Sequence, residues 1–279
     1  YNNSTATAAC SLTIAAFDSV TLGTRNFTST FSGPVKVELV DSSGGACAGS
    51  TLATVTGVAI TAATGKGTVN LPAIPATVYP NVRVRISYPD TGTAQVSSCS
   101  NDNFAIRPAS LSFAATDGDW ETAGTTRTLN NQTAPGGTVH KAGRPFTITV
   151  TAFDGAGTTA SNYAGTPAAS ITSYLVPAAG CLNAVACSLS GGTFEDGTAN
   201  DGKVASITAS YNEVGSFNMQ VIDNNFSNVD SSDSTTAERY ASSAASAVGR
   251  FVPDHFDLST STLSAACASG GPVSYTHLR

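Results

Sequence analysis

The sequence predicts an all-β protein built from tandem immunoglobulin-like antiparallel β-sandwiches, and three observations lead to this fold class. Thr, Val, Ile and Gly fill runs in which apolar and polar residues alternate, which favours strands. Residues that favour helices are scarce, since only 11% of the 279 residues are charged and there is a single Met. Turn-forming residues recur at short intervals, as expected between the short strands of a sandwich.

The first predicted module covers residues 1–107. Strict alternation over residues 35–39 and 82–86 predicts two strands, each with one buried and one exposed face. Turn chemistry separates them at residues 41–45, 65–67 and 72–80. These short spacings favour antiparallel strands over alternating strands and helices.

The second predicted module covers residues 108–249 and contains long loops. Its alternating segments are residues 146–152, 205–211 and 216–222. The short connection from Tyr211 to Gly215 predicts a hairpin between the last two strands, and Tyr211 resembles the corner tyrosine of immunoglobulin-like sandwiches. The polar stretch 223–247 is expected to be a surface loop or a connection between modules.

A weak internal repeat predicts the start of a truncated third module at residues 250–272. Asn103-Phe-Ala-Ile-Arg-Pro108 closes the first module and Gly249-Arg-Phe-Val-Pro-Asp-His-Phe256 closes the second, each joining an apolar strand to a rigid proline. Residues 273–279 look like a translated sequencing adapter and are left out of the fold prediction. The chain is therefore expected to be a fragment of a longer reading frame.

Charge and hydropathy exclude two classes of partner. The net charge is −6 and no Lys/Arg-rich run is present, so neither nucleic acid nor an anionic lipid surface is expected to bind. No apolar stretch reaches the roughly 20 residues that a membrane-spanning helix needs.

The six cysteines predict disulfides and hence an exported protein. None lies in a Cys-x-x-Cys pair or near a histidine at zinc-ligand spacing. Cys181 and Cys187 enclose a five-residue loop and are the best local pair. Cys47 and Cys99 are the preferred pair in the first module, although Cys10 competes for either of them. Disulfides persist in oxidising compartments.

The sequence predicts neither catalysis nor a cofactor. His140, His255 and His277 are the only histidines, and no triad can be built from them, so turn or strand-end hydrogen bonds are expected for the first two. Asp117, Asp119 and Glu121 are calcium candidates, although no metal site is predicted because Asp is also a common turn residue. A second acidic cluster, interpreted in the same way, contains Asp223, Asn225, Asp230 and Asp233.

Several motifs resemble the MshQ-like proteins of mannose-sensitive haemagglutinin (MSHA) pilus biogenesis, over roughly residues 10–267. Besides the two module-closing motifs they are Asn162-Tyr-Ala-Gly165 and Tyr211-Asn-Glu-Val-Gly-Ser216, and they give Tyr211, Gly215, Arg250, Phe251 and Pro253 as motif residues. The resemblance implies an exported protein of a Gram-negative bacterium, at the cell surface, associated with the outer membrane or extracellular. It implies association with type IV pilus machinery and a role in adhesion, and it transfers no catalytic residue.

We therefore expect a non-enzymatic surface protein whose modules act as a stalk or spacer. Its expected partners are pilus or other surface proteins, and host or surface glycans through domains outside this chain. Two alternatives stay open: an accessory region of a secreted carbohydrate-active enzyme, and a calcium-dependent binding module.

Overall fold

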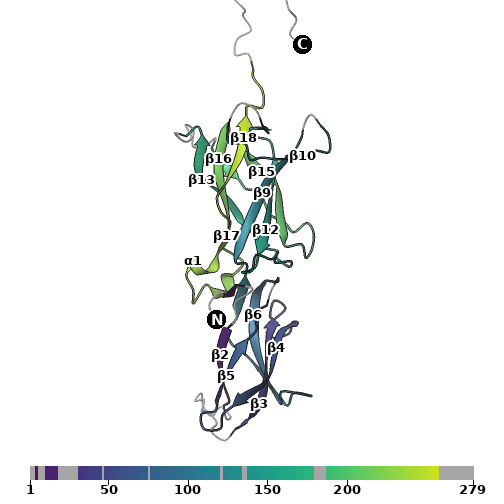
Figure 1. Ribbon diagram of the computed structural model, residues 1–279, viewed down its shortest axis with the longest axis vertical. Helices are drawn as coiled ribbons and strands as arrows, with labels where there is room; N and C mark the ends of the chain where they lie inside the picture. The colour runs from purple at the N-terminus through teal and green to yellow at the C-terminus, as the bar shows by residue number, and fades with distance from the viewer. Residues whose placement is uncertain are drawn as a thin grey trace, which may run out of the picture.

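The computed structural model describes residues 4–5, 10–17, 31–45, 47–74, 76–119, 122–133, 137–178 and 187–257. Two β-sandwiches are stacked end to end along the long axis of the molecule (Figure 1). The only helical segments in the described part are the 3-10 helix η1 (Asn228–Asp230) and α1 (Thr236–Arg239). The all-β prediction is confirmed.

The first sandwich has one large and one small sheet. The large sheet has the order β1-β8-β6-β3-β4 with β7 paired to β6, and β2 pairs with β5 in the small sheet. Its strands are β1 (Ser4–Thr5), β2 (Cys10–Ala15), β3 (Gly33–Asp41), β4 (Thr51–Ile60), β5 (Lys66–Leu71), β6 (Tyr79–Tyr88), β7 (Val96–Cys99) and β8 (Phe104–Arg107). All pairs are antiparallel except β1 with β8.

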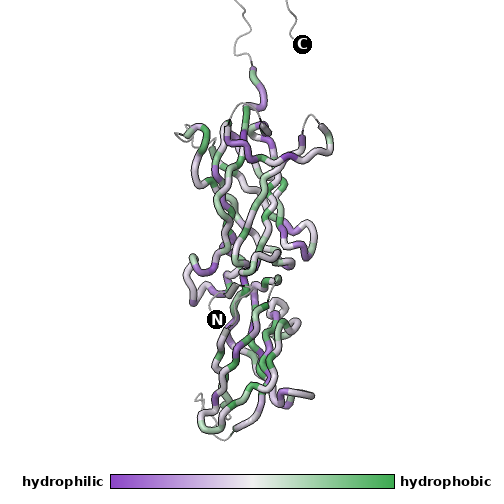
Figure 2. The backbone as a smooth tube through the Cα atoms, in the orientation of Figure 1, coloured by the Kyte–Doolittle hydropathy of each residue, from purple (hydrophilic) through white to green (hydrophobic). Residues whose placement is uncertain are grey.

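The predicted strands of the first sandwich lie inside β3 and β6. Val35, Val37 and Leu39 alternate along β3 and are at most 3% exposed, because successive side chains point to opposite faces of a strand. Val82 of β6 joins them in the core. Figure 2 shows hydrophobic residues gathered along the strands and hydrophilic ones at many connecting loops.

The second sandwich has sheet orders β10-β9-β12-β15-β14 and β11-β18-β16-β13, with β17 paired to β16. Its strands are β9 (Ser110–Gly118), β10 (Thr126–Thr128), β11 (His140–Lys141), β12 (Phe146–Phe153), β13 (Ala168–Val176), β14 (Leu189–Ser190), β15 (Lys203–Tyr211), β16 (Gly215–Asp223), β17 (Ala241–Ser242) and β18 (Ser246–Val252). The three strands predicted from alternation lie within β12, β15 and β16.

The hairpin predicted between β15 and β16 is wrong, because these strands belong to different sheets. The connection turns from one layer to the other at Gly215, whose φ is 126°. A methyl group at Gly215 would overlap the carbonyl oxygen of Val176 in β13. Glycine therefore permits both the backbone angle and the close approach of the two chains.

The second sandwich extends past its predicted boundary at residue 249. β18 pairs with β16 and β11, and Phe251 is 1% exposed in the core. Residues 250–252, expected at the start of a third module, therefore lie in a strand of the second sandwich. Residues 258–279, which include the expected adapter sequence, lie outside the described residues.

The motif residues Tyr211 and Phe251 belong to one aromatic cluster of this core. The Tyr211 ring lies 4.7 Å from that of Phe217 and 5.1 Å from that of Phe251. The pKa of Tyr211 is raised to about 12, mainly by burial and to a smaller extent by Tyr174 and Glu213. The role of Tyr211 is therefore core packing next to the turn between the sheets.

Candidate functional site at the junction of the sandwiches

A very short segment joins the two sandwiches. β8 ends at Arg107 and β9 begins at Ser110, so only Pro108 and Ala109 lie between them. The Ala109 N–H donates to the carbonyl oxygen of Phe153 at 2.8 Å, which holds this segment against β12. Proline at the strand end fixes the chain direction without removing a hydrogen bond from the interior of a sheet.

The loop that follows β12 holds the β5–β6 connection of the first sandwich. Asn162 accepts from the Val78 N–H at 2.7 Å through Oδ1 and donates to the Val78 carbonyl oxygen at 2.6 Å through Nδ2. Ser161 donates its backbone N–H to the Ala76 carbonyl oxygen at 3.0 Å. A carboxamide matches a peptide group because it offers one acceptor and one donor side by side.

Asp154 adds a buried carboxylate to the same contact. Its Oδ2 accepts from the Ala76 N–H of the first sandwich at 3.1 Å, while Oδ1 accepts from the N–H groups of Ala156 and Thr158. Burial alone would raise the pKa of Asp154, but the backbone N–H donors outweigh it and lower the pKa below its usual value. The charged form is thus the one that this junction stabilises.

Asp230 makes a second contact between the sandwiches, next to β8. The Asp230 Oδ2 accepts from the Ala105 N–H at 3.1 Å, and nearby the Arg107 Nε donates to the Glu238 carbonyl oxygen at 3.0 Å. Asp230 is 1% exposed and its Oδ1 has no hydrogen-bond partner in the described part of the chain.

The environment of Asp230 opposes its negative charge. Burial is the main cause that raises its pKa to about 6, the Ala105 N–H acts in the opposite direction, and the charges of Asp233 and Asp102 raise the pKa further. The junction therefore contains two buried carboxylates whose pKa values are shifted in opposite directions.

The loop that carries Asn162 is anchored in the core of its own sandwich. The buried Tyr163 hydroxyl donates to Asp223 Oδ2 at 2.7 Å, and the pKa of Tyr163 is raised by burial and by that carboxylate. Asp223 Oδ1 accepts from the backbone N–H groups of Asn225 and Phe226. A Cβ atom at Gly165 would overlap Asp223 Oδ2. This motif thus holds the side chain that bridges the two sandwiches in position.

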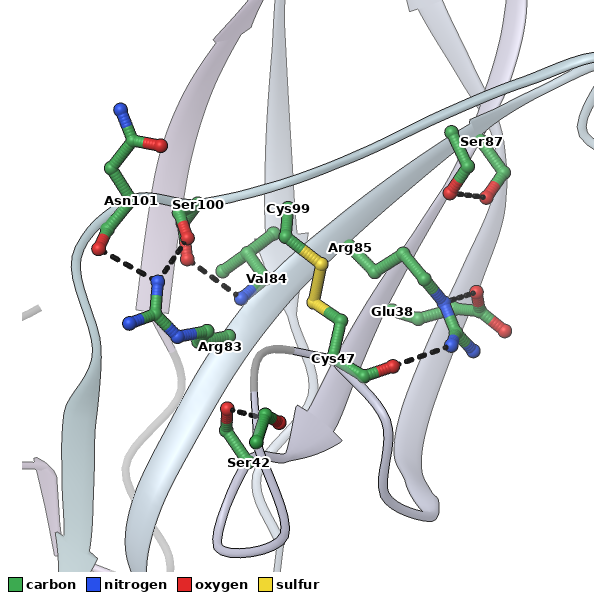
Figure 3. The surroundings of a disulfide bond; sticks show 12 residues. Glu38, Ser42, Cys47, Arg83, Val84, Arg85, Ser87, Cys99, Ser100 and Asn101 are labelled. Atoms are coloured by element: carbon green, nitrogen blue, oxygen red, sulfur yellow. Dashed lines mark hydrogen bonds and ion pairs between the residues drawn. A yellow bond between two sulfur atoms is a disulfide. The ribbon is translucent and has the colours of Figure 1, made fainter.

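The predicted disulfide between Cys47 and Cys99 is present (Figure 3). It joins the β3–β4 connection to the end of β7, with a Cα–Cα distance of 6.3 Å. Arg85, which lies opposite Cys99 in the sheet, donates to Glu38 at 2.9 Å and to the Cys47 carbonyl oxygen at 3.4 Å. Burial raises the pKa of Glu38, but Arg85 and Lys36 outweigh this effect and lower it.

The other predicted pair can be followed at one end only. Cys187 is 4% exposed and disulfide-bonded. Cys181 lies outside the described residues, so its pairing with Cys187 stays a prediction.

The calcium candidates Asp117 and Asp119 face cationic side chains. Asp117 is buried and accepts from Arg127 at 3.1 and 2.7 Å and from His140 Nδ1 at 2.8 Å. Asp119 lies 3.8 Å from Arg127, and Glu121 lies outside the described residues. A calcium ion would have to displace the guanidinium of Arg127. In the described part of the chain, no group of three or more His, Cys, Asp or Glu side chains is arranged to hold a metal.

His140 is buried and hydrogen-bonded in the short strand β11, which fits the expected strand-end hydrogen bond and not the exposed turn. It is 4% exposed between the rings of Phe146 and Phe251, at 5.8 and 5.7 Å. Its Nε2 faces the Arg144 carbonyl oxygen at 3.0 Å while Nδ1 faces Asp117. Both ring nitrogens thus lie within hydrogen-bond distance of an oxygen atom. His255 is exposed and lies beside Asp254 and Asp257.

Two other motif residues lie at the far end of the second sandwich. Arg250 is half-buried in β18, and Pro253 is exposed just after that strand. The position of Pro253 after β18 repeats that of Pro108 after β8.

The role of the junction motifs in joining the sandwiches was not predicted from the sequence. Asn162 and Ala105 lie in motifs that carried the resemblance, whereas Asp154 drew no attention and Asp230 was considered only as a calcium ligand. Both motifs contain residues with no apparent role within a single sandwich, and this could have indicated a contact between sandwiches. The long segment 223–247 likewise connects β16 to β18 within the second sandwich, and its Asp230 and Glu238 contact the first.

Three comparisons with known proteins complete this description. Residues 213–277 match the family described as DUF6701, third domain, and the matched range begins in the β15–β16 connection and includes β16 and β18. No curated protein and no solved structure matched the chain. No helix in the described part is both long and apolar enough to cross a membrane. The chain thus contains a DUF6701 third-domain match, from a family of uncharacterised function, within an all-β protein.

Proposed function

We propose that the two sandwiches form a stiff, non-enzymatic spacer in an exported surface protein of a Gram-negative bacterium, associated with MSHA-type pilus biogenesis or adhesion. The observation that carries the proposal is the hydrogen-bonded junction. Sandwiches joined by a flexible linker move independently, which is the usual behaviour of domains with small polar interfaces. Here the linker has two residues, and side chains of one sandwich bind the backbone of the other.

Stiffness follows from where these contacts lie. Asp154 and Asn162 hold the β5–β6 connection, while Asp230 holds β8. Separate contacts on two elements, together with the covalent link, oppose both bending and twisting. Breaking the Asn162 contact would leave the N–H and C=O of Val78 without partners, at a cost of about 1–3 kcal/mol for each buried group.

Export and the association with pili rest on other observations. The Cys47–Cys99 disulfide supports an oxidising compartment. The motifs that resemble those of MshQ-like proteins support a place among surface proteins of this kind. Display of other domains at a distance from the cell is what a spacer contributes to adhesion.

The experiment is a measurement of relative domain orientation by residual dipolar couplings. A stiff spacer requires that one alignment tensor fit both sandwiches of the wild-type chain. The Asn162→Ala variant, especially when combined with Asp154→Ala, should require two tensors. Asn70→Ala, on exposed β5 surface, serves as the matched control and should leave the single tensor unchanged. Two independent tensors in the wild-type chain would refute the stiff spacer.

A further inference from the structure

The far end of the second sandwich repeats the strand ends that form the junction in the first. Ile106 of β8 lies opposite Tyr79 of β6, and Phe251 of β18 lies opposite Gly215 of β16. Ile106 also pairs in parallel with the two-residue strand β1, and Phe251 with the two-residue strand β11. Both residues lie two positions before a proline. The two strand ends therefore correspond at these paired positions.

This correspondence places Val214 where Val78 stands. Both residues come directly before the first residue of the equivalent strands β6 and β16. The backbone of Val78 is held by Asn162 of the other sandwich, whereas the N–H of Val214 donates to the carboxylate of the preceding residue, Glu213, at 2.7 Å. The Glu213 side chain thus binds the Val214 N–H, whereas the equivalent N–H of Val78 is bound by a side chain of the neighbouring sandwich.

Exposure differs between the equivalent positions. Val78 is 1% exposed and Val214 is 36% exposed. Leu111 and Phe256 each lie three residues after the proline that follows the last strand of a sandwich, and they are 4% and 90% exposed. Two apolar side chains at this end are thus exposed where their counterparts at the first junction are buried.

We infer that this end, the distal face (Glu213, Val214 and the end of β18), is a docking surface for a further β-sandwich of the same kind. A carboxamide from a loop of that sandwich, equivalent to Asn162, binds the peptide group of Val214 and displaces Glu213. The first strand of that sandwich takes the position of Phe256, just as β9 contains Leu111. The inference rests on the proposed spacer and extends its junction to a second site.

The test uses a chain of residues 1–253 followed directly by a second copy of residues 109–257, so that Ala109 follows Pro253 as it follows Pro108. Amide hydrogen exchange is measured at Val214 and at Val78. Docking should slow exchange at Val214 by about 100-fold relative to residues 1–257. Asn162→Ala in the added copy alone should restore fast exchange at Val214 and leave Val78 slow.

The two positions separate the possible failures. Slow exchange at Val78 with fast exchange at Val214 would overturn the docking inference and leave the spacer intact. Fast exchange at both Val78 and Val214 would refute the proposed spacer as well. An added copy that remains unfolded in this register would also count against the inference, because the distal face is inferred to accept this sandwich.

Discussion

Replacing Asp230 by Asn should stabilise the protein at neutral pH, although Asp230 makes a hydrogen bond at the junction. The Asn side chain keeps an acceptor for the Ala105 N–H and removes a buried charge that Asp233 and Asp102 oppose. A pKa raised from 3.8 to about 6 corresponds to about 3 kcal/mol of unfavourable energy for the ionised folded state. Asp230→Asn should therefore gain up to about 3 kcal/mol at pH 7.

The pH dependence supplies a sharper number. Because the folded protein binds the Asp230 proton more tightly than the unfolded chain, this group adds stability as the pH falls through about 6. With the two pKa values above, the linkage relation gives about 1.3 kcal/mol between pH 7 and pH 5. The advantage of the variant over the wild type should shrink by that amount.

Urea unfolding at pH 7, 6 and 5 measures both quantities, provided that the two proteins have equal denaturant slopes. Taking the difference between variant and wild type cancels the other groups, among them Asp154, whose lowered pKa makes stability fall as the pH falls. Asp196→Asn, on an exposed loop, is the matched control and should show no pH-dependent difference. A variant that is no more stable at pH 7, or a difference that does not vary with pH, would refute this account of Asp230.

Three further predictions concern the cores. Gly215→Ala should cost about 4 kcal/mol or more by thermal unfolding because of its φ and the Val176 oxygen, whereas Gly197→Ala, in open space, should cost little; equal losses would contradict the turn geometry. Replacing Cys47 and Cys99 together by Ala removes a cross-link over 52 residues and should cost about 4 kcal/mol in urea unfolding; an unchanged unfolding midpoint would show that the cross-link does not stabilise the fold. His140→Phe keeps ring packing but removes the hydrogen bonds to Asp117 and the Arg144 carbonyl oxygen, and should cost about 2–4 kcal/mol; an unchanged melting temperature would show that those bonds do not matter.

Alternation along the chain was sufficient to find the core strands. Residues 35–39 and 146–152 alternate between apolar and polar, and their apolar members are buried in β3 and β12. Local sequence can decide this because the two faces of a strand differ at every second residue. The same argument located β6, β15 and β16 and hence the all-β class.

Local sequence could not decide which strands share a sheet. The β15–β16 connection is short and is followed by Gly215, as in a hairpin. The two strands nevertheless lie in different layers, because β15 pairs with β12 and β14 whereas β16 pairs with β13 and β18, which places Gly215 beside Val176. The pairing of Cys47 was open for the same reason. Cys99 comes near it only because β7 pairs with β6.

The sequence by itself thus determined the fold class and the positions of the core strands, since composition and periodicity are local properties. Only the tertiary structure decided what Asp154, Asn162 and Asp230 do. In the sequence they are ordinary loop residues, and their function depends on backbone groups of another sandwich, 78, 84 and 125 residues away. Such contacts form only when both sandwiches have folded, because a side chain of the second sandwich then binds a backbone group that the first sandwich leaves free.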